Sequence, residues 1–225
     1  MNVLGIETAT DVCSIGIVSG ERRFERSLRE SRIHSEKLLV VLSEVLEEAS
    51  LKWAGIQAVA LSSGPGSFTG LRIGASTVKG LLSPENRPFV KVPTFDGISS
   101  AYLREHGPVK GHMICLDAKQ DEWYVQKIGS DGIRGPISLI GTSLLMGQIA
   151  GSVVLTDVPN RFHEHNGVFD LHRWCSGTAI ADVGRQKLEE GARDDVRVFE
   201  PSYWKEFVVR TVPKAVRPQP EAKEK

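Results

Sequence analysis

The sequence predicts an α/β protein of two lobes, and three observations carry this prediction. Short apolar runs typical of buried strands alternate with helical patterns along the chain. A strand, a small polar tip and a returning strand stand at residues 3–18, and the same arrangement recurs at residues 112–128. Gly107 and Pro108 interrupt regular structure between the two halves, so we place a hinge there.

The composition is that of an ordinary globular protein, with 40% hydrophobic and 25% charged residues. The formal net charge of zero argues against a protein that grips a nucleic-acid backbone over a broad face. Three cysteines, Cys13, Cys115 and Cys175, stand far apart in no metal-binding spacing, which predicts reduced thiols packed in a core. No apolar run approaches the ~20 residues of a membrane span, so we expect a cytoplasmic protein.

The first three strands are predicted at residues 3–7, 12–18 and 22–28. The tip between the first two contains Glu7, Thr8 and Thr10. The actin/hexokinase-like fold begins in the same way, with its tip facing the phosphates of ATP, although this is an analogy of fold alone. An ordinary hairpin whose hydroxyl groups bond to the turn explains the same residues, and we favour it over catalysis.

A helix is predicted over residues 34–50, because apolar residues recur there at helical spacing. Leu38, Leu42 and Val45 belong to this stripe, which suits a core or a subunit interface. His34 has Glu30 four residues before it and Leu38 four residues after it, so a helical two-histidine metal site is not formed. We therefore expect no metal at this helix.

A glycine-rich turn at residues 62–74 lies between a predicted strand, 56–61, and a second helix. It suits a phosphate cradle, a nucleophilic serine or a tight strand-to-helix corner. The spacing fits neither a P-loop nor a dinucleotide-binding fingerprint, and the glycines that would flank a serine nucleophile at Ser67 are absent. Ser67 or Thr69 is expected to cap the helix. Spacing alone leaves the corner and the functional roles equally open.

The remaining elements follow from the same patterns. Strands are predicted at residues 88–92, 112–117, 122–128 and 152–156, and helices at residues 95–105, 142–150 and 178–190. Residues 157–175 are expected to be irregular, and His106, His163, His165 and His172 to be lone solvated side chains. Residues 213–225 are rich in proline and charge without periodicity, which predicts a disordered tail.

The run Gly64-Pro65-Gly66-Ser67-Phe68-Thr69-Gly70-Leu71-Arg72-Ile73-Gly74, together with Ile33-His34-Ser35-Glu36-Lys37-Leu38 before it, resembles the bacterial TsaB (YeaZ) family. The resemblance extends to residues 117–124, where the chain keeps Asp117, Ala118, Glu122 and Tyr124 but has Lys119 for the family's arginine and Asp121 for its glycine. It is visible again at residues 200–203. The resemblance implies an actin-like/hexokinase-like (ASKHA) α/β fold of two lobes.

The resemblance also implies a role. A family member is an accessory subunit with no catalytic residue or cofactor of its own, which pairs its two helices with those of a TsaD-like catalytic subunit. That subunit transfers a threonylcarbamoyl group to the adenosine 3′ of the anticodon in tRNA. A TsaE-like ATPase is a further partner, tRNA is met only within the complex, and the chain alone is expected to form a homodimer. ATP or ADP at a subunit interface stays open.

The implied interface residues are His34, Leu38, Leu42, Val45, Thr69, Arg72, Ile73 and Ser76, within a docking face at residues 33–46 and 69–82. Glu7, Thr8, Thr10, Asp117 and Lys119 are predicted vestiges of a nucleotide site, where Asp121 adds a charge that would repel phosphate. Two rival functions are an actin-like ATPase or kinase using Glu7, Thr8 and Asp117, and a peptidase.

The domain prediction places residues 1–106 in the first lobe and residues 107–195 in the second. Residues 196–212 are expected to pack back on the first lobe.

Overall fold

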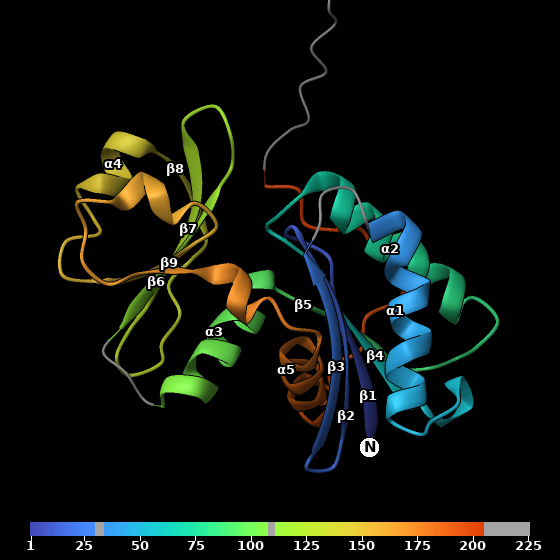
Figure 1. The fold of residues 1–225 in the computed structure, drawn as a ribbon. Coiled ribbons are helices and arrows are strands. Elements are labelled where there is room, and N and C mark those ends of the chain that lie inside the picture. Colours follow the sequence, from blue (N-terminus) through green and yellow to red (C-terminus); the bar gives the residue numbers. More distant parts are fainter. Residues whose placement is uncertain (30–33, 108–110, 205–225) are drawn as a thin grey trace, which may run out of the picture.

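The computed structural model describes residues 1–29, 34–107 and 111–204. Two lobes lie side by side, each with a five-stranded mixed sheet (Figure 1). The predicted α/β two-lobe architecture is therefore confirmed. Within the described residues, no helix is both long and apolar enough to cross a bilayer.

The first sheet has the order β3-β2-β1-β4-β5. Its strands are β1 (Asn2–Glu7), β2 (Val12–Ser19), β3 (Arg22–Arg29), β4 (Ala58–Ser62) and β5 (Phe89–Val92). The first three strands pair antiparallel, whereas β4 and β5 continue the sheet in parallel with β1. The central strands are nearly continuous apolar runs because both of their faces are covered, and the charged strand β3 forms one edge.

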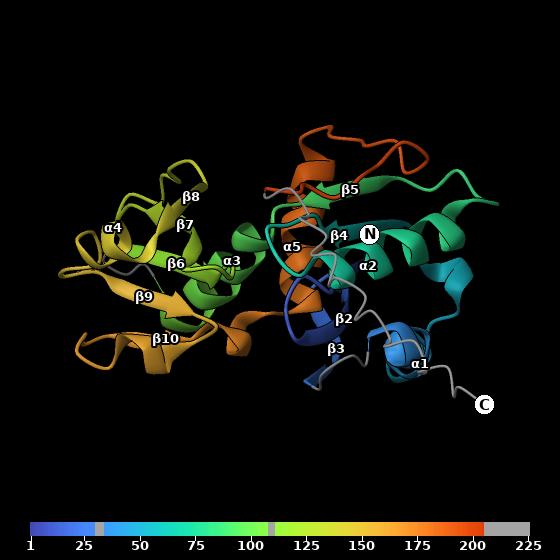
Figure 2. The ribbon, with the colours of Figure 1, turned by 90° about the horizontal axis from the view of Figure 1, so that it is seen from above.

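Helices α1 (His34–Glu48) and α2 (Phe68–Leu82) cover one face of this sheet, and α5 (Gly177–Glu189) covers the other (Figure 2). Helix α5 was predicted to belong to the second lobe, so this packing corrects the boundary placed at residue 195. The physical reason is close approach. A side chain at Gly5 of β1 would lie 2.1 Å from the Gly177 carbonyl oxygen, and one at Gly184 would lie 2.4 Å from Ala60.

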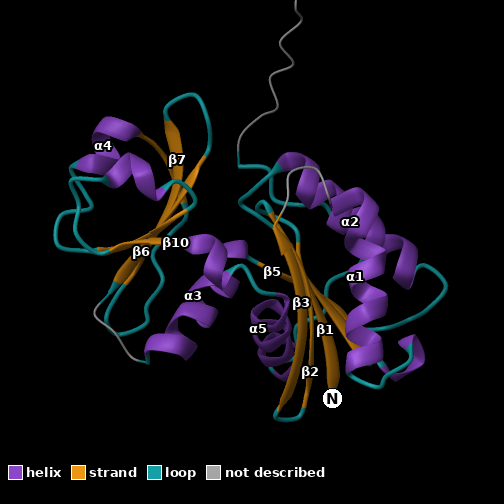
Figure 3. Cartoon of the chain, in the orientation of Figure 1, coloured by secondary structure: helices purple, strands orange, loops and turns teal. Residues whose placement is uncertain are grey.

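The second sheet has the order β10-β9-β6-β7-β8. Figure 3 shows its strands in orange, in the lobe that also holds α4. Its strands are β6 (His112–Asp117), β7 (Glu122–Ile128), β8 (Ser138–Gly141), β9 (Val153–Thr156) and β10 (Val168–Asp170). Helix α3 (Thr94–His106) joins the lobes, and α4 (Thr142–Met146) follows β8. The predicted helix at 142–150 is thus shorter.

Residues 157–175 are not irregular, because β10 and the 3₁₀ turns η2 (Pro159–Phe162) and η3 (Leu171–Trp174) lie there; a third turn, η1 (Trp53–Gly55), follows α1. Such short elements carry too little periodicity to be recognised from sequence.

The two lobes share apolar contacts. Val12 of the first sheet packs in one cluster with Phe95 and Ile98 of α3 and with Ile114 of the second sheet. All three cysteines are buried and free, as predicted. The described part of the C-terminal segment lies on the first lobe, where the Phe199 ring is 5.2 Å from that of Phe89. Residues 205–212 and the predicted tail, 213–225, lie outside the described residues.

Candidate functional site

The glycine-rich turn holds the first hairpin tip against the start of α2. The Ser67 amide donates to the Ala9 carbonyl oxygen at 2.6 Å, and the Ser67 hydroxyl accepts from the Gly70 amide at 3.2 Å. A side chain at Gly66 would lie 2.2 Å from the Ala9 oxygen, and one at Gly70 would lie 2.0 Å from the Thr8 oxygen. The glycines are therefore needed for backbone-to-backbone contact, and protein atoms already occupy two donors at the N-terminus of this helix. This geometry favours the tight corner over the phosphate cradle.

Glu7 and Thr8 are buried beneath this corner. The Glu7 carboxylate is 1% exposed and accepts from the Ala9 amide at 2.6 Å. Burial raises the pKa of Glu7 to about 7, against the smaller opposing effect of its hydrogen bonds. Thr8 is fully buried. Both residues were predicted as vestiges of a nucleotide site, but the structure places them in the support of the tip.

A cavity of about 440 Å³, here called the tip cleft, lies between the tips of the two lobes. It is lined by Ala9, Thr10, Asp11, Gly66, Ser67, Phe68, Leu116, Asp117, Ala118, Lys119, Gln120, Tyr124, Asp157 and His172. Of the predicted vestigial residues, Thr10, Asp117 and Lys119 meet here. The lining combines a partly aromatic, apolar surface with three carboxylates and one ammonium group, so it suits a ligand that is apolar and cationic.

The carboxylates of the tip cleft differ in their surroundings. Burial opposes the charge of Asp117, but the Lys119 ammonium at 2.9 Å and its backbone amide hold the pKa of that carboxyl below its usual value. Burial, together with the neighbouring charge of Asp117, raises the pKa of Asp157. Asp121 is not part of the cleft lining; Arg161 contacts it at 3.3 Å and the Thr142 hydroxyl donates to it at 2.5 Å. The concentration of negative charge disfavours a polyphosphate.

Asp157 was missed by the sequence analysis, although a signal for it existed. It follows strand β9 directly, just as Asp117 ends strand β6, and these two strands are parallel neighbours. The carboxyl ends of parallel strands meet at one edge of a sheet, which brings the two residues together. The Asp117 amide donates to Asp157 at 3.0 Å.

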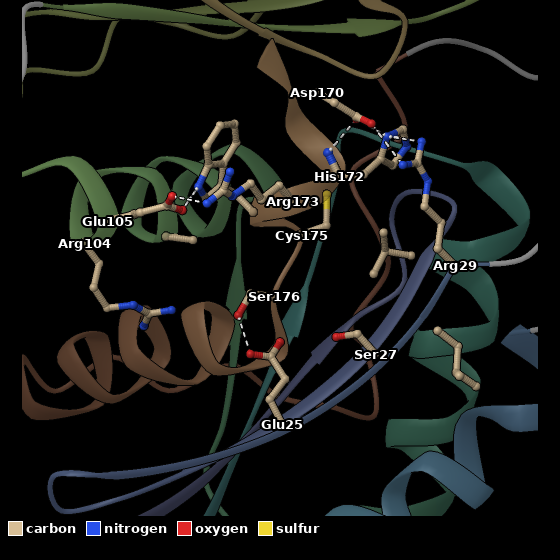
Figure 4. A pocket seen from close by; sticks show the side chains of 14 residues that line it. Glu25, Ser27, Arg29, Arg104, Glu105, Asp170, His172, Arg173, Cys175 and Ser176 are labelled. Atoms are coloured by element: carbon tan, nitrogen blue, oxygen red, sulfur yellow. Dashed lines mark hydrogen bonds and ion pairs between the residues drawn. The ribbon is translucent and has the colours of Figure 1, made fainter.

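A second cavity, of about 560 Å³, lies between β3, α3 and η3 and is called the side cavity (Figure 4). Its charged groups are used in pairs that hold its walls together. Arg29 contacts Asp170 at 2.9 Å, and Arg173 and the Trp174 ring nitrogen both donate to Glu105. Glu25 accepts from the Gly177 amide at 2.8 Å, which places a carboxylate at the N-terminus of α5.

His172 lines both cavities and is buried, so its prediction as a lone solvated histidine is wrong. Its Nδ1 atom lies 2.6 Å from the Asp170 carboxylate and 2.8 Å from the Arg29 guanidinium. His106 is likewise not lone, since it stacks on the Tyr102 ring at 4.4 Å. His165 contacts the Ser152 carbonyl oxygen at 2.9 Å, whereas His163 is exposed. No group of three or more metal-ligating side chains occurs in the part of the chain that the structure describes.

The predicted interface residues divide into two groups. Leu38, Leu42 and Val45 are buried in the core of the first lobe, so they do not form an exposed surface and that part of the prediction is corrected. They pack inward because the stripe faces the sheet, which periodicity alone could not distinguish from an interface. The apolar residues that α1 exposes are instead Leu39 and Val40, at 60% and 46%.

On α2, the predicted residues do reach the surface. Thr69, Arg72 and Ser76 are exposed and Ile73 is half-buried. The Arg72 guanidinium lies 5.1 Å from the centre of the Phe68 ring. The side chain of His34 lies outside the described residues, although α1 begins at this residue.

The fold and its tip cleft define a two-lobe α/β protein with a five-stranded mixed sheet in each lobe. Residues 29–134 match the family model of TsaD, described as tRNA N6-adenosine threonylcarbamoyltransferase. The chain is 27% identical over 135 residues to the tRNA threonylcarbamoyladenosine biosynthesis protein TsaB of Haemophilus influenzae, covering 60% of this chain and 56% of that one. It is 31% identical over 127 residues to TsaB of Escherichia coli K12, covering 55% and 53%.

Among solved structures, YeaZ from Pseudomonas aeruginosa shares this fold with a TM-score of 0.75 at 20% identity, covering 90% of this chain and 99% of that one. The chain is thus similar in sequence to TsaB proteins and shares the fold of YeaZ. Its match spans little more than half the length of the TsaB relatives from H. influenzae and E. coli.

Proposed function

We propose that this chain is an accessory subunit in the threonylcarbamoylation of tRNA. It binds a TsaD-like catalytic subunit and supports transfer of the threonylcarbamoyl group to the adenosine 3′ of the anticodon. A TsaE-like ATPase is a further partner, tRNA is contacted within the complex, and the chain pairs with itself when the catalytic subunit is absent. Sequence similarity to TsaB proteins supports this role.

The observation that carries the proposal is the outer surface of α1 and α2. Leu39 and Val40 expose neighbouring apolar side chains on α1, although the same helix buries an apolar stripe on its other side. Helices α1 and α2 contact each other, and α2 adds Ile73 and Arg72 to this outer surface. Exposed apolar residues on paired helices are typical of a surface that another protein covers.

The tip cleft supports an accessory role over the rival ATPase or kinase. The cleft lining has three carboxylates and one lysine. This excess of negative charge would repel the phosphates of ATP. The start of α2, where a phosphate would otherwise bind, is occupied by the hairpin tip through the Ser67 amide and hydroxyl. Neither observation favours a peptidase.

The test is to mix the full chain with the TsaD-like subunit of the same organism and to measure the mass of the particles in solution. We expect a one-to-one complex to replace the homodimer. The double variant Leu39→Glu/Val40→Glu should weaken this complex at least ~10-fold, because two buried charges at an interface without partners are costly.

The matched control is Ile133→Glu, which introduces the same charge at an exposed apolar residue of the second lobe. It should bind like the unchanged chain. Because all three positions are exposed, the variants should keep their thermal stability, which separates lost binding from lost folding. If the double variant bound the catalytic subunit as tightly as the unchanged chain does, the assigned surface would be wrong. If the full chain did not bind the catalytic subunit at all, the proposed role would be wrong.

A further inference from the structure

The described chain ends at the rim of the tip cleft. The Ser202 amide donates to the Ser63 carbonyl oxygen at 2.8 Å, which fixes the last residues beside the glycine-rich turn. The Tyr203 ring then packs 4.9 Å from the ring of Phe68, a residue that lines the cleft. Residues 205–225 therefore start from a point next to this cavity.

These 21 residues have the chemistry that the cleft complements. Apolar side chains come first, at Phe207, Val208, Val209 and Val212. Basic residues surround and follow them at Lys205, Arg210, Lys214, Arg217, Lys223 and Lys225, against acidic residues at Glu206, Glu221 and Glu224. Six positive and three negative side chains leave the segment with a net charge of +3.

The cleft offers the matching groups. Phe68, Leu116 and Tyr124 supply its apolar surface, beside carboxylates of opposite charge to the segment. The Lys119 ammonium is bonded to Asp117, which leaves Asp11 and Asp157 as the carboxylates not bonded to it. At about 3.3 Å per extended residue, the eight residues 205–212 reach roughly 26 Å, which is ample to enter a cavity that begins beside Tyr203.

We propose that residues 207–212 of this same chain, which carry four apolar side chains and the single positive charge of Arg210, occupy the tip cleft. The segment is tethered at the rim, so its effective concentration is on the order of 1 mM. A segment with a dissociation constant of ~100 μM in free form would thus fill the cleft about ten times out of eleven. This inference does not depend on the proposed docking role, because α1 and the outer surface of α2 take no part in it.

The test compares the full chain with a chain that ends at Trp204. The shorter chain is expected to fold, because every residue of the four described apolar cores lies between Val3 and Phe199. A fluorescent peptide of residues 205–225 should bind the shorter chain. It should bind the full chain at least ~5-fold more weakly, because the tethered segment competes with it. Fluorescence anisotropy measures both affinities.

Two controls identify the site and the chemistry. Asp11→Lys in the shorter chain should weaken peptide binding ~10-fold, whereas Glu189→Lys, an equal charge change at the exposed end of α5, should not. A peptide of the same composition in scrambled order should bind less tightly than the native one. Equal binding to both chains, equal binding of the scrambled peptide, or no binding up to 1 mM would each overturn the proposal.

Discussion

The two lobes have the same strand topology, but the acidic residue that ends the central strand is buried in one lobe and borders a cavity in the other. In each, the central strand pairs antiparallel with the next strand on one side and parallel with a later strand on the other, and each of these neighbours pairs in the same sense with an edge strand. Strand β1 ends at the carboxylate of Glu7, and strand β6 ends at that of Asp117. Glu7 is buried beneath the glycine-rich turn, whereas Asp117 borders the tip cleft and pairs with Lys119.

The difference follows from what comes after the neighbouring parallel strand. In the first lobe, β4 leads through the glycines into α2, whose 15 residues close over the tip. In the second lobe, β9 leads into the four-residue turn η2 in place of a long helix. Lys119, Gln120 and Asp121 there adopt left-handed backbone angles, with φ near +60°. The carboxylate of Glu7 is thus part of a packed scaffold, while that of Asp117 belongs to the polar wall of a cavity.

The largest effect is expected at the contact that closes the first tip. Gly70→Val would place a side chain 2.0 Å from the Thr8 carbonyl oxygen, and backbone atoms on both sides cannot move aside. We expect a loss of about 4 kcal/mol or more in the free energy of unfolding, measured by urea denaturation. The matched control is Gly80→Ala in the same helix, where nothing lies within 4 Å; it should stabilise by about 0.5–1 kcal/mol. Equal tolerance of both variants would contradict the closed-tip geometry.

The next effect concerns the pH dependence of stability. The pKa of Glu7 is raised from 4.5 to about 7 in the folded chain, so folding favours the protonated group. The stabilisation this gives is complete below pH 4.5 and is lost as the pH rises through 7. At ~1.4 kcal/mol per pKa unit, the whole change amounts to about 3 kcal/mol.

Glu7→Gln should remove this dependence, because an uncharged amide occupies the same site. The difference in unfolding free energy between the variant and the unchanged chain should grow from pH 4.5 to pH 7, in favour of the variant. Urea denaturation at a series of pH values measures it, and other titrating groups cancel in the difference. A constant difference across this range would contradict the buried position of Glu7.

The smallest effect is expected at the equivalent position of the second lobe. The lowered pKa of Asp117 has the opposite sign, so its contribution is present above the ordinary carboxyl range and is lost as the pH falls through the lowered pKa. Its ion pair with the exposed Lys119 is screened by solvent, so Asp117→Asn should cost less than about 1 kcal/mol at pH 7. A loss as large as that at Gly70 would mean that the two tips are equally structural.

Much of the fold was predictable because periodicity and turn chemistry are local. The strands that end at Glu7 and Asp117 and the helices at His34 and after Ser67 were recognised. The cap was expected at Ser67 or Thr69, and the structure has it at Ser67. The site was predicted less well. Thr10, Asp117 and Lys119 were named and do line the tip cleft, but Asp157 was missed and Glu7 and Thr8 were placed in the wrong environment.

The sequence by itself determined the strand and helix order, the duplicated strand–tip–strand units and the resemblance to TsaB, because these depend on local pattern and on a long, specific motif. Only the tertiary structure decided which side of α1 is free and which lobe α5 covers. It also decided that the glycines serve backbone contact. Each of these depends on which segments, distant in the sequence, come within a few ångströms of each other. A glycine permits such an approach but does not say what approaches it.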